Sequence, residues 1–215
     1  MNPAATALTA EDERGSSVTH GVGLVGAVAA APFLIINAVS TGAASDVVGA
    51  AIFAASLILL YLVSTLYHAV RRSSIKQRLQ RLDHAAIYVL IAGTYTPFTL
   101  GVLRGGWGWS LFGVIWAAAA LGVATKLVRG VRQPRLSAAL YVAMGWLVLV
   151  AIPPLVTRVP QAGVVWLVLG GLAYSGGVFF YLRSTRYAHT IWHVFVLAGS
   201  VCHVVAVFGY AARGG

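Results

Sequence analysis

Charged residues are scarce in this sequence. Asp, Glu, Lys and Arg together make up 9% of the 215 residues, whereas hydrophobic residues make up 59%. A soluble domain typically carries about a quarter charged residues, so this chain cannot cover a water-facing surface, which excludes a soluble globular protein. The mean hydropathy is +0.84, and the apolar runs, about 20 residues each, are long enough to cross roughly 30 Å of hydrocarbon. The composition therefore predicts a polytopic membrane protein.

Cysteine is almost absent as well. The one cysteine, Cys202, lies inside an apolar run, which excludes an intrachain disulfide and a closed thiolate metal site. The first 19 residues contain three acidic residues and lack a basic segment followed by an apolar core, so no cleavable signal peptide is expected. We expect residues 1–19 to form a short cytoplasmic tail and residues 20–215 to form a single seven-helix transmembrane domain.

The long apolar runs predict transmembrane helices at residues 20–39, 47–69, 83–102, 108–128, 137–157, 163–182 and 189–210. The strands of a membrane β-barrel would be short segments of alternating polarity, whereas these runs are apolar on all sides. The predicted fold class is therefore an all-α bundle of seven transmembrane helices. Kinks are expected at Pro32, at Pro97 and at the pair Pro153–Pro154, because proline removes a helical hydrogen bond.

Positive charges fall mainly at one set of helix ends. The richer side holds twelve of the fifteen lysines and arginines: Arg14, Arg71, Arg72, Lys76, Arg78, Arg81, Lys126, Arg129, Arg132, Arg135, Arg183 and Arg186. The other side holds Arg104, Arg158 and Arg213. Because cytoplasmic loops carry the excess of Lys and Arg, we expect the N-terminus in the cytoplasm and the C-terminus outside. Loops that face anionic lipid headgroups explain the net charge of +10, and no nucleic-acid partner is expected.

Three histidines and an aspartate gather at the predicted cytoplasmic ends of three helices. His68 ends the second span, Asp83 opens the third, and His189 and His193 lie in the first turns of the seventh. His189 and His193 are four residues apart and share a helix face. Two imidazoles from one helix and one from another provide three corners of a tetrahedron, the three-histidine zinc arrangement that leaves the fourth position for water. We therefore predict a Zn²⁺ site at His68, His189 and His193.

Asp83 is the one acidic residue outside the N-terminal tail and the loop residue Asp46. A carboxylate close to the hydrocarbon is costly and marks a functional site by default. We expect Asp83 to contact the metal through water, to orient that water and to accept its proton. Ser64 precedes His68 by one helical turn and is expected to hold the water or to donate a hydrogen bond to an oxyanion.

The remaining histidines have simpler expected roles. His84 reads as an interfacial residue, and His20 as a structural one that bonds Glu13 or a lipid headgroup. His203 follows His193 by ten residues, or about 15 Å of helical rise, too far to bind the same ion. It is a buried hydrogen-bond donor or lines an inner cavity. A two-haem arrangement with His189 and His203 would need a matching pair on a facing helix, and the second span offers only His68. One haem held between His68 and His189 is conceivable but disfavoured.

Four segments resemble the hemolysin III group of bacterial membrane proteins: EDERGSSVTHGVG, STLYHA, RLDHAAIYVLIAGTYTPF and AHTIWHVFVLAGSVCH. This group is similar to the progestin and adipoQ receptors, which include the adiponectin receptors, and more distantly to the alkaline ceramidases. The resemblance implies seven helices with the N-terminus inside. It also implies a zinc held by His68, His189 and His193, with Asp83 contacting the metal through water and Ser64 one turn before the first histidine.

The resulting functional hypothesis is a zinc-dependent hydrolase that cleaves an amide or ester bond of a membrane lipid, with Asp83 and Ser64 as catalytic residues. The resemblance to ceramidases favours such chemistry, and a membrane lipid is the expected partner and substrate. The alternatives are a pore-forming cytolysin, as the hemolysin name implies, and a receptor-like regulator with structural zinc. Against a pore, no predicted span carries a polar stripe along its length.

Overall fold

The computed structural model describes residues 9–40, 43–71 and 73–212, and every regular element in these ranges is helical. The long helices are α1 (Ala10–Ser40), α2 (Ala44–Ala69), α3 (Ser73–Leu100), α4 (Gly106–Arg129), α7 (Gln161–Tyr181) and α8 (Ala188–Tyr210). Between α4 and α7 the chain forms α5 (Pro134–Gly145), the 3₁₀ turn η2 (Leu147–Ala151) and α6 (Ile152–Arg158). The all-α fold class is confirmed.

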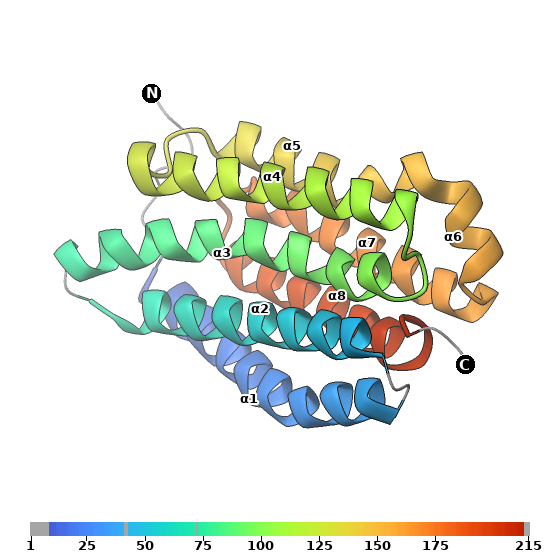
Figure 1. The fold of residues 1–215 in the computed structure, drawn as a ribbon. Helices are drawn as coiled ribbons and strands as arrows, with labels where there is room; N and C mark the ends of the chain where they lie inside the picture. Colours follow the sequence, from blue (N-terminus) through green and yellow to red (C-terminus); the bar gives the residue numbers. More distant parts are fainter. Residues whose placement is uncertain (1–8, 41–42, 72, 213–215) are drawn as a thin grey trace.

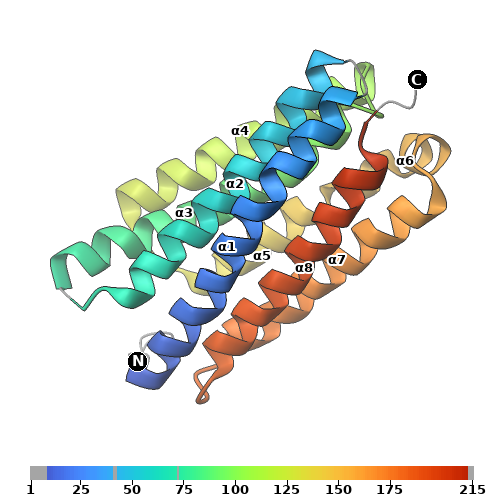
Figure 2. The same ribbon diagram turned by 90° about the horizontal axis from the view of Figure 1, so that it is seen from below.

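The helices run side by side along one axis, so that the start of α1 and the end of α8 lie at opposite ends of the bundle (Figure 2). α1 packs against α2 and α8, α2 against α3, α3 against α4, and α7 against α8. α3 lies in the middle of this arrangement (Figure 1). Residues far apart in the sequence, at the start of α1, the end of α2 and the start of α8, therefore meet at one end.

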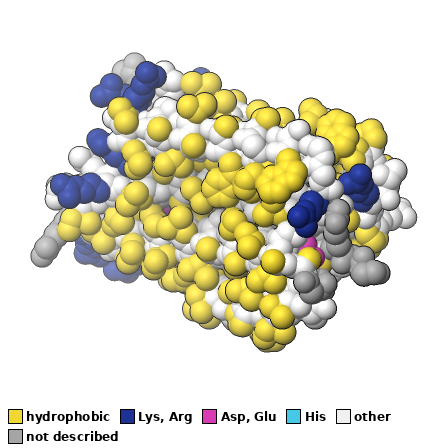
Figure 3. Space-filling view, in the orientation of Figure 1, with side chains coloured by type: hydrophobic (Ala, Val, Ile, Leu, Met, Phe, Trp, Pro, Cys, Tyr) yellow, Lys and Arg dark blue, Asp and Glu magenta, His cyan; other side chains and the backbone are white. Residues whose placement is uncertain are grey.

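Six helical stretches of the described chain are long and apolar enough to cross a membrane: α1, α2, α4, the segment Pro134–Arg158, α7 and α8. Large apolar side chains such as Val25, Leu121 and Val201 are exposed on their outer faces, and Figure 3 shows hydrophobic atoms across the visible face. Because such a surface is stable only in lipid, the chain is a multi-pass membrane protein, as predicted.

The seventh expected span, residues 83–102, is helical within α3 but is not among these six stretches. α3 carries buried hydroxyls at Thr94, Thr96 and Thr99. Each hydroxyl donates to a carbonyl three or four residues earlier in the same helix. The hydroxyls are thus bonded within α3 itself. Because α3 lies among other helices and faces less lipid, it can be less hydrophobic than the other spans.

Two other expectations about helix limits need adjustment. α1 begins at Ala10, so described residues that were assigned to the tail 1–19 are helical. The division into a tail and a domain remains a prediction. The break expected at Pro153–Pro154 lies slightly earlier, where η2 interrupts the segment and the two prolines occupy the first turn of α6. Proline fits there, because the first turn leaves backbone N–H groups unbonded in any case. Pro32 and Pro97 lie inside continuous helices.

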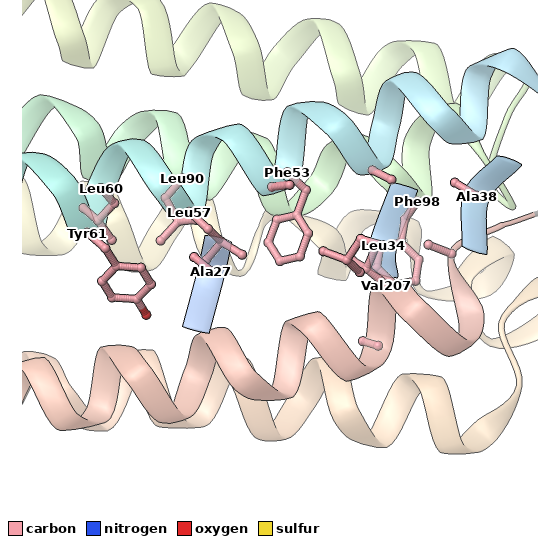
Figure 4. Close-up of a cluster of buried hydrophobic side chains, with 14 of the residues drawn as sticks. Ala27, Leu34, Ala38, Phe53, Leu57, Leu60, Tyr61, Leu90, Phe98 and Val207 are labelled. Atoms are coloured by element: carbon pink, nitrogen blue, oxygen red, sulfur yellow. The ribbon is translucent and has the colours of Figure 1, made fainter. Parts of the chain in front are cut away.

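The main core fills the space between α1, α2, α3 and α8. Phe53, Leu57 and Tyr61 project from one face of α2 into it and are 0–2% exposed, and Figure 4 shows them between α2 and α8. Leu34 from α1 and Val207 from α8 complete its far end. Side chains that are buried in this way hold together α2 and α8, which carry His68, His189 and His193.

Gly49 provides a test of this packing. A Cβ atom at Gly49 on α2 would lie 2.8 Å from the Cα of Pro97 on α3, so the two backbones would have to separate. We expect Gly49→Ala to lower the free energy of unfolding by about 1–3 kcal/mol, measured by thermal unfolding in detergent. The control is Gly26→Ala, where a Cβ meets nothing within 4 Å and helix propensity favours alanine. Equal stability of the two variants would contradict the packing.

Candidate metal centre

Three histidines meet near one end of the bundle. His68 lies in the last turn of α2, and His189 and His193 lie in the first two turns of α8. Their ring centroids are 4.8–5.1 Å apart. One candidate ligand atom from each ring lies within 4.8 Å of the other two. The structure therefore brings the three predicted imidazoles into one cluster that could hold a metal ion.

The hydrogen bonds of these rings determine which nitrogen is available. His68 Nδ1 donates to the Glu13 carboxylate at 2.7 Å, and His193 Nδ1 donates to the Ser16 carbonyl at 3.2 Å. These oxygens accept, so in the neutral rings Nδ1 carries the proton and Nε2 carries a lone pair. The Nε2 atoms of His68, His189 and His193 are buried and have no partner among the described residues. Three converging imidazole lone pairs suit a divalent transition metal.

Glu13 connects this cluster to the surface of the bundle. Its second carboxylate oxygen pairs with Lys76 at 2.9 Å, and the Lys76 ammonium also donates to the carbonyls of Tyr67 and Val70 at 3.1 and 3.3 Å. The lysine thereby holds Glu13 against the end of α2. This role of Glu13 was not predicted from the sequence. The available signal was only that acidic residues precede the first span of an acid-poor chain.

The first turn of α1 also contacts the start of α8. The Asp12 carboxylate accepts a hydrogen bond from the backbone N–H of Tyr187 at 2.6 Å. Tyr187 is the one non-glycine residue of the described chain with a positive φ, 61°, a conformation that costs about 1–3 kcal/mol. Arg186 donates to Glu11, and this hydrogen bond raises the pKa of Arg186. The buried Asp12 carboxylate therefore holds the start of α8 and fixes the position of its histidines, whereas the Arg186–Glu11 pair is exposed and contributes little.

Asp83 and Ser64 are buried close to this end of the bundle. Asp83 is 2% exposed and Ser64 is 0% exposed. Asp83 Oδ2 lies 3.6 Å from His84 Nδ1, and neither this oxygen nor Ser64 Oγ has a hydrogen-bond partner among the described residues. Asp83 is not one of the three residues whose ligand atoms cluster. It lines the adjacent cavity instead. This position is compatible with a contact to the metal through water, and the catalytic roles assigned to both residues remain predictions.

His20 lies against the cluster. Its ring stacks on His193 with a centroid distance of 3.5 Å and an interplanar angle of 9°, and its edge meets Tyr61 at 5.1 Å. The expected bond to Glu13 is not formed, since Glu13 bonds His68. His20 is 2% exposed, and both ring nitrogens lack a partner in the described chain. It is therefore a fourth buried imidazole of this region. From the sequence, only a structural role was expected for it.

The other two histidines lie apart from the cluster. His84 was expected at the membrane interface, but it is 5% exposed, and its Nδ1 donates to the Gln80 carbonyl at 2.9 Å, because α3 lies inside the bundle. His203 lines the cavity, and its Nε2 is 3.4 Å from the Leu167 carbonyl.

A cavity of about 110 Å³ adjoins the cluster. His20, Asp83 and Trp192 line one end of it, and Thr94, Trp146 and His203 are among the residues farther along. Most of the remaining lining is apolar and comes from α3, α5, α7 and α8. The arrangement thus joins a polar centre to an apolar space that suits an alkyl chain.

A comparison with family models matches residues 8–204 to the family described as Haemolysin-III related. The chain belongs to the haemolysin-III family. It is 42% identical to the Hemolysin-3 homolog of Bacillus subtilis (strain 168), over 95% of this chain and 97% of that protein. It is 41% identical to Hemolysin-3 of Bacillus cereus, over 93% and 92%. The human Monocyte to macrophage differentiation factor is 30% identical, over 75% of this chain and 70% of that protein.

The family assignment confirms the resemblance that the four sequence segments suggested. The matched range contains the three clustered histidines together with Glu13 and His20. The haemolysin-III match therefore includes the whole candidate metal centre, including the start of α1.

Glu13 gives this centre a test in the haemolysin-III chain. Removing the Glu13 carboxylate leaves the Nδ1 atom of His68 without its hydrogen bond, so the orientation of the His68 ring is no longer fixed. We expect Glu13→Ala to weaken metal binding by about 10- to 100-fold, measured by equilibrating purified protein with buffered divalent metal and determining metal per chain. The control is Glu11→Ala, which removes the contact with Arg186 and should leave metal affinity unchanged. Unchanged affinity in Glu13→Ala would show that Glu13 does not support the ligand.

Proposed function

We propose that this protein is a zinc-dependent hydrolase that cleaves an amide or ester bond of a membrane lipid. The observation that carries the proposal is the apolar cavity that begins at Asp83 and His20, beside three histidines with free Nε2 atoms. A metal centre that opens onto an apolar cavity suits a substrate with a polar reacting group and an alkyl chain. Imidazole ligands without thiolates favour zinc among the common metals, although they also accommodate other divalent ions.

The chain's own residues have distinct proposed roles. His68, His189 and His193 hold the metal, which when bound supplies Lewis acidity and lowers the pKa of water. Asp83 orients the attacking water and accepts its proton through Oδ2, which has no hydrogen-bond partner in the described chain. Ser64 donates its hydroxyl to the developing oxyanion. The apolar walls exclude other water from the reacting bond.

The substrate is proposed to come from the lipid bilayer. Gly145 on α5 lines the cavity and is also exposed on the outside of the bundle, so the cavity reaches a lipid-facing surface there. Gly171 and Ser175 on α7 line the same side. A Cβ atom at Gly145 would meet nothing within 4 Å, whereas the Trp146 ring lies against Gly171 and bonds Ser175. An alkyl chain would therefore enter beside Gly145.

We further propose seven transmembrane helices, with α3 as the seventh, and an N-terminus in the cytoplasm. The support is the distribution of Lys and Arg: Figure 3 shows most of the visible ones at one end of the molecule. Lys76, Arg78 and Arg81 in the first turns of α3 belong to the same end as His68. By the positive-inside rule this end faces the cytoplasm, which puts the reaction close to the inner leaflet.

Asp83→Asn tests the enzymatic proposal. The substitution removes the proton acceptor and leaves the three histidines intact. We expect full zinc content and a loss of turnover of at least about 100-fold, measured with zinc-loaded protein and a panel of lipid amides and esters. The control is Asp46→Asn at the other end of α2, which should remain active. If fully loaded wild-type protein cleaves nothing while a homologous hydrolase succeeds in parallel, the enzymatic proposal is wrong, and a receptor-like regulator with structural zinc becomes the better reading.

A second candidate function, cytolysis, is favoured by one observation: the relative from Bacillus cereus is named Hemolysin-3. Against it, the buried polar atoms of the described residues that lack a hydrogen-bond partner gather mainly at one end of the bundle. A packed apolar core around Phe53 and Leu57 fills the space beyond them. A pore would need a polar path along the whole bundle.

Dye release from liposomes distinguishes the two functions. We expect purified wild-type protein to release no more dye than protein-free detergent controls, because the described residues leave no continuous polar path through the bundle. Release that rises with protein concentration and is unchanged in Asp83→Asn would favour the pore and contradict this expectation.

A further inference from the structure

The cavity extends from the metal centre deep into the bundle. On α3 its lining runs from Asp83 to Tyr95, and on α8 from Trp192 to His203. These stretches advance by twelve and eleven residues, or roughly 18 and 16 Å at the helical rise of about 1.5 Å per residue. On α8, His203 is therefore the lining residue farthest from the candidate metal centre.

His203 presents an acceptor that is unused within the chain. Its Nε2 lies 3.4 Å from the Leu167 carbonyl. A carbonyl oxygen only accepts, so Nε2 carries the proton and Nδ1 carries the lone pair. That Nδ1 atom is buried and has no hydrogen-bond partner among the described residues. An unpaired acceptor in an apolar interior is costly, so its presence beside a cavity indicates a donor supplied from outside the chain.

The neighbouring polar groups are already paired with one another. Trp146 Nε1 donates to the Ser175 hydroxyl at 2.9 Å, and the Thr94 hydroxyl donates to the Ile91 carbonyl at 2.7 Å. The Tyr174 hydroxyl bonds Ser200 at 2.9 Å. A buried water needs two to four polar partners, and most of the remaining lining of the cavity is apolar. A ligand that lies in the cavity is the better source of the donor.

Two glycines show that the rings at this end have defined places. A Cβ atom at Gly170 on α7 would overlap the His203 ring, and one at Gly199 on α8 would lie 2.8 Å from the Tyr174 ring. The His203 imidazole thus lies directly against the α7 backbone, and its edge faces Tyr174 with a centroid distance of 5.4 Å. Since this packing restricts rotation of the ring, Nδ1 is a fixed acceptor.

We propose that the lipid substrate carries a hydroxyl group in the middle of its alkyl chain and that this hydroxyl donates to His203 Nδ1. The proposal rests on the proposed function, because it names the substrate class of the same cavity. An extended chain with bonds of about 1.5 Å covers roughly 16 Å in about a dozen carbons. The hydroxyl is therefore expected near carbons 10 to 12, counted from the reacting carbonyl. A charged group at this depth is excluded by the cost of burying an unpaired charge.

Fatty acids, as products of the proposed cleavage, provide the probes. Zinc-loaded protein in detergent is titrated with octadecanoic acid and with its 2-hydroxy, 10-hydroxy and 12-hydroxy derivatives, and affinities are measured by displacement of a fluorescent fatty acid. We expect the 10-hydroxy or the 12-hydroxy derivative to bind about five-fold more tightly than octadecanoic acid, the size of one net hydrogen bond. The 2-hydroxy derivative should show no such gain, because its hydroxyl lies at the other end of the cavity.

His203→Phe keeps an aromatic ring and removes the acceptor. We expect it to lose the preference while it retains zinc content and affinity for octadecanoic acid, which shows that the cavity is intact. His203→Gln, which restores an acceptor oxygen, should recover part of the preference. The matched control is Thr94→Val, whose hydroxyl bonds its own helix, and it should keep the full preference.

Three results would overturn this inference. Equal binding of plain and mid-chain hydroxylated acids by wild-type protein would do so and would leave the proposed hydrolase intact. A preference that persists in His203→Phe would remove His203 from the recognition. Binding of no fatty acid at all to zinc-loaded protein would contradict the alkyl-chain cavity, and the proposed lipid substrate would fail with it.

Discussion

The hydrogen bonds from His68 and His193 to helix α1 determine what the rest of the structure can do. Because Nδ1 of each ring is committed to Glu13 or to the Ser16 carbonyl, Nε2 is left as a buried lone pair without a partner in the described chain. Each such atom costs about 1–3 kcal/mol, and several lie together at one end of the bundle. A metal ion binds to unprotonated lone pairs of this kind. A metal ion at this end would therefore provide the missing partners and remove the cost.

The apolar core makes this concentration of unpaired polar atoms tolerable. Phe53, Leu57 and Tyr61 pack between α1, α2 and α8 along most of their length, so these helices meet at fixed depths. α1 contributes twice, by packing in the core and by holding the start of α8 through Asp12. The cavity lies on the other side of the centre, between α3, α5, α7 and α8. α8 belongs to both parts of the bundle, since it carries His189 and His193 and also lines the cavity through Trp192 and His203.

Much of the fold and of the ligand set was predictable from the sequence, because lipid imposes simple rules. Long apolar runs must be helical, and two histidines four residues apart must share a helix face, so the contribution of α8 followed from spacing alone. The contacts of Glu13 with His68 and of His20 with His193 were not predicted, because the partners come from other helices and no sequence pattern indicates such contacts. α3 was read as an ordinary span, whereas its polar side chains are explained by its central position. The unpaired Nδ1 of His203 depends on a contact with Leu167, 36 residues away, and only the structure shows it.

The most direct test of this account is the metal content of detergent-purified protein by elemental mass spectrometry, for the wild type and for the His189→Ala/His193→Ala double variant. The account predicts about one zinc per wild-type chain and its loss in the double variant, because a single remaining imidazole cannot hold the ion. Wild-type protein that carries no metal after purification with added zinc would contradict the account. It would leave the buried lone pairs of His68, His189 and His193 without an explanation.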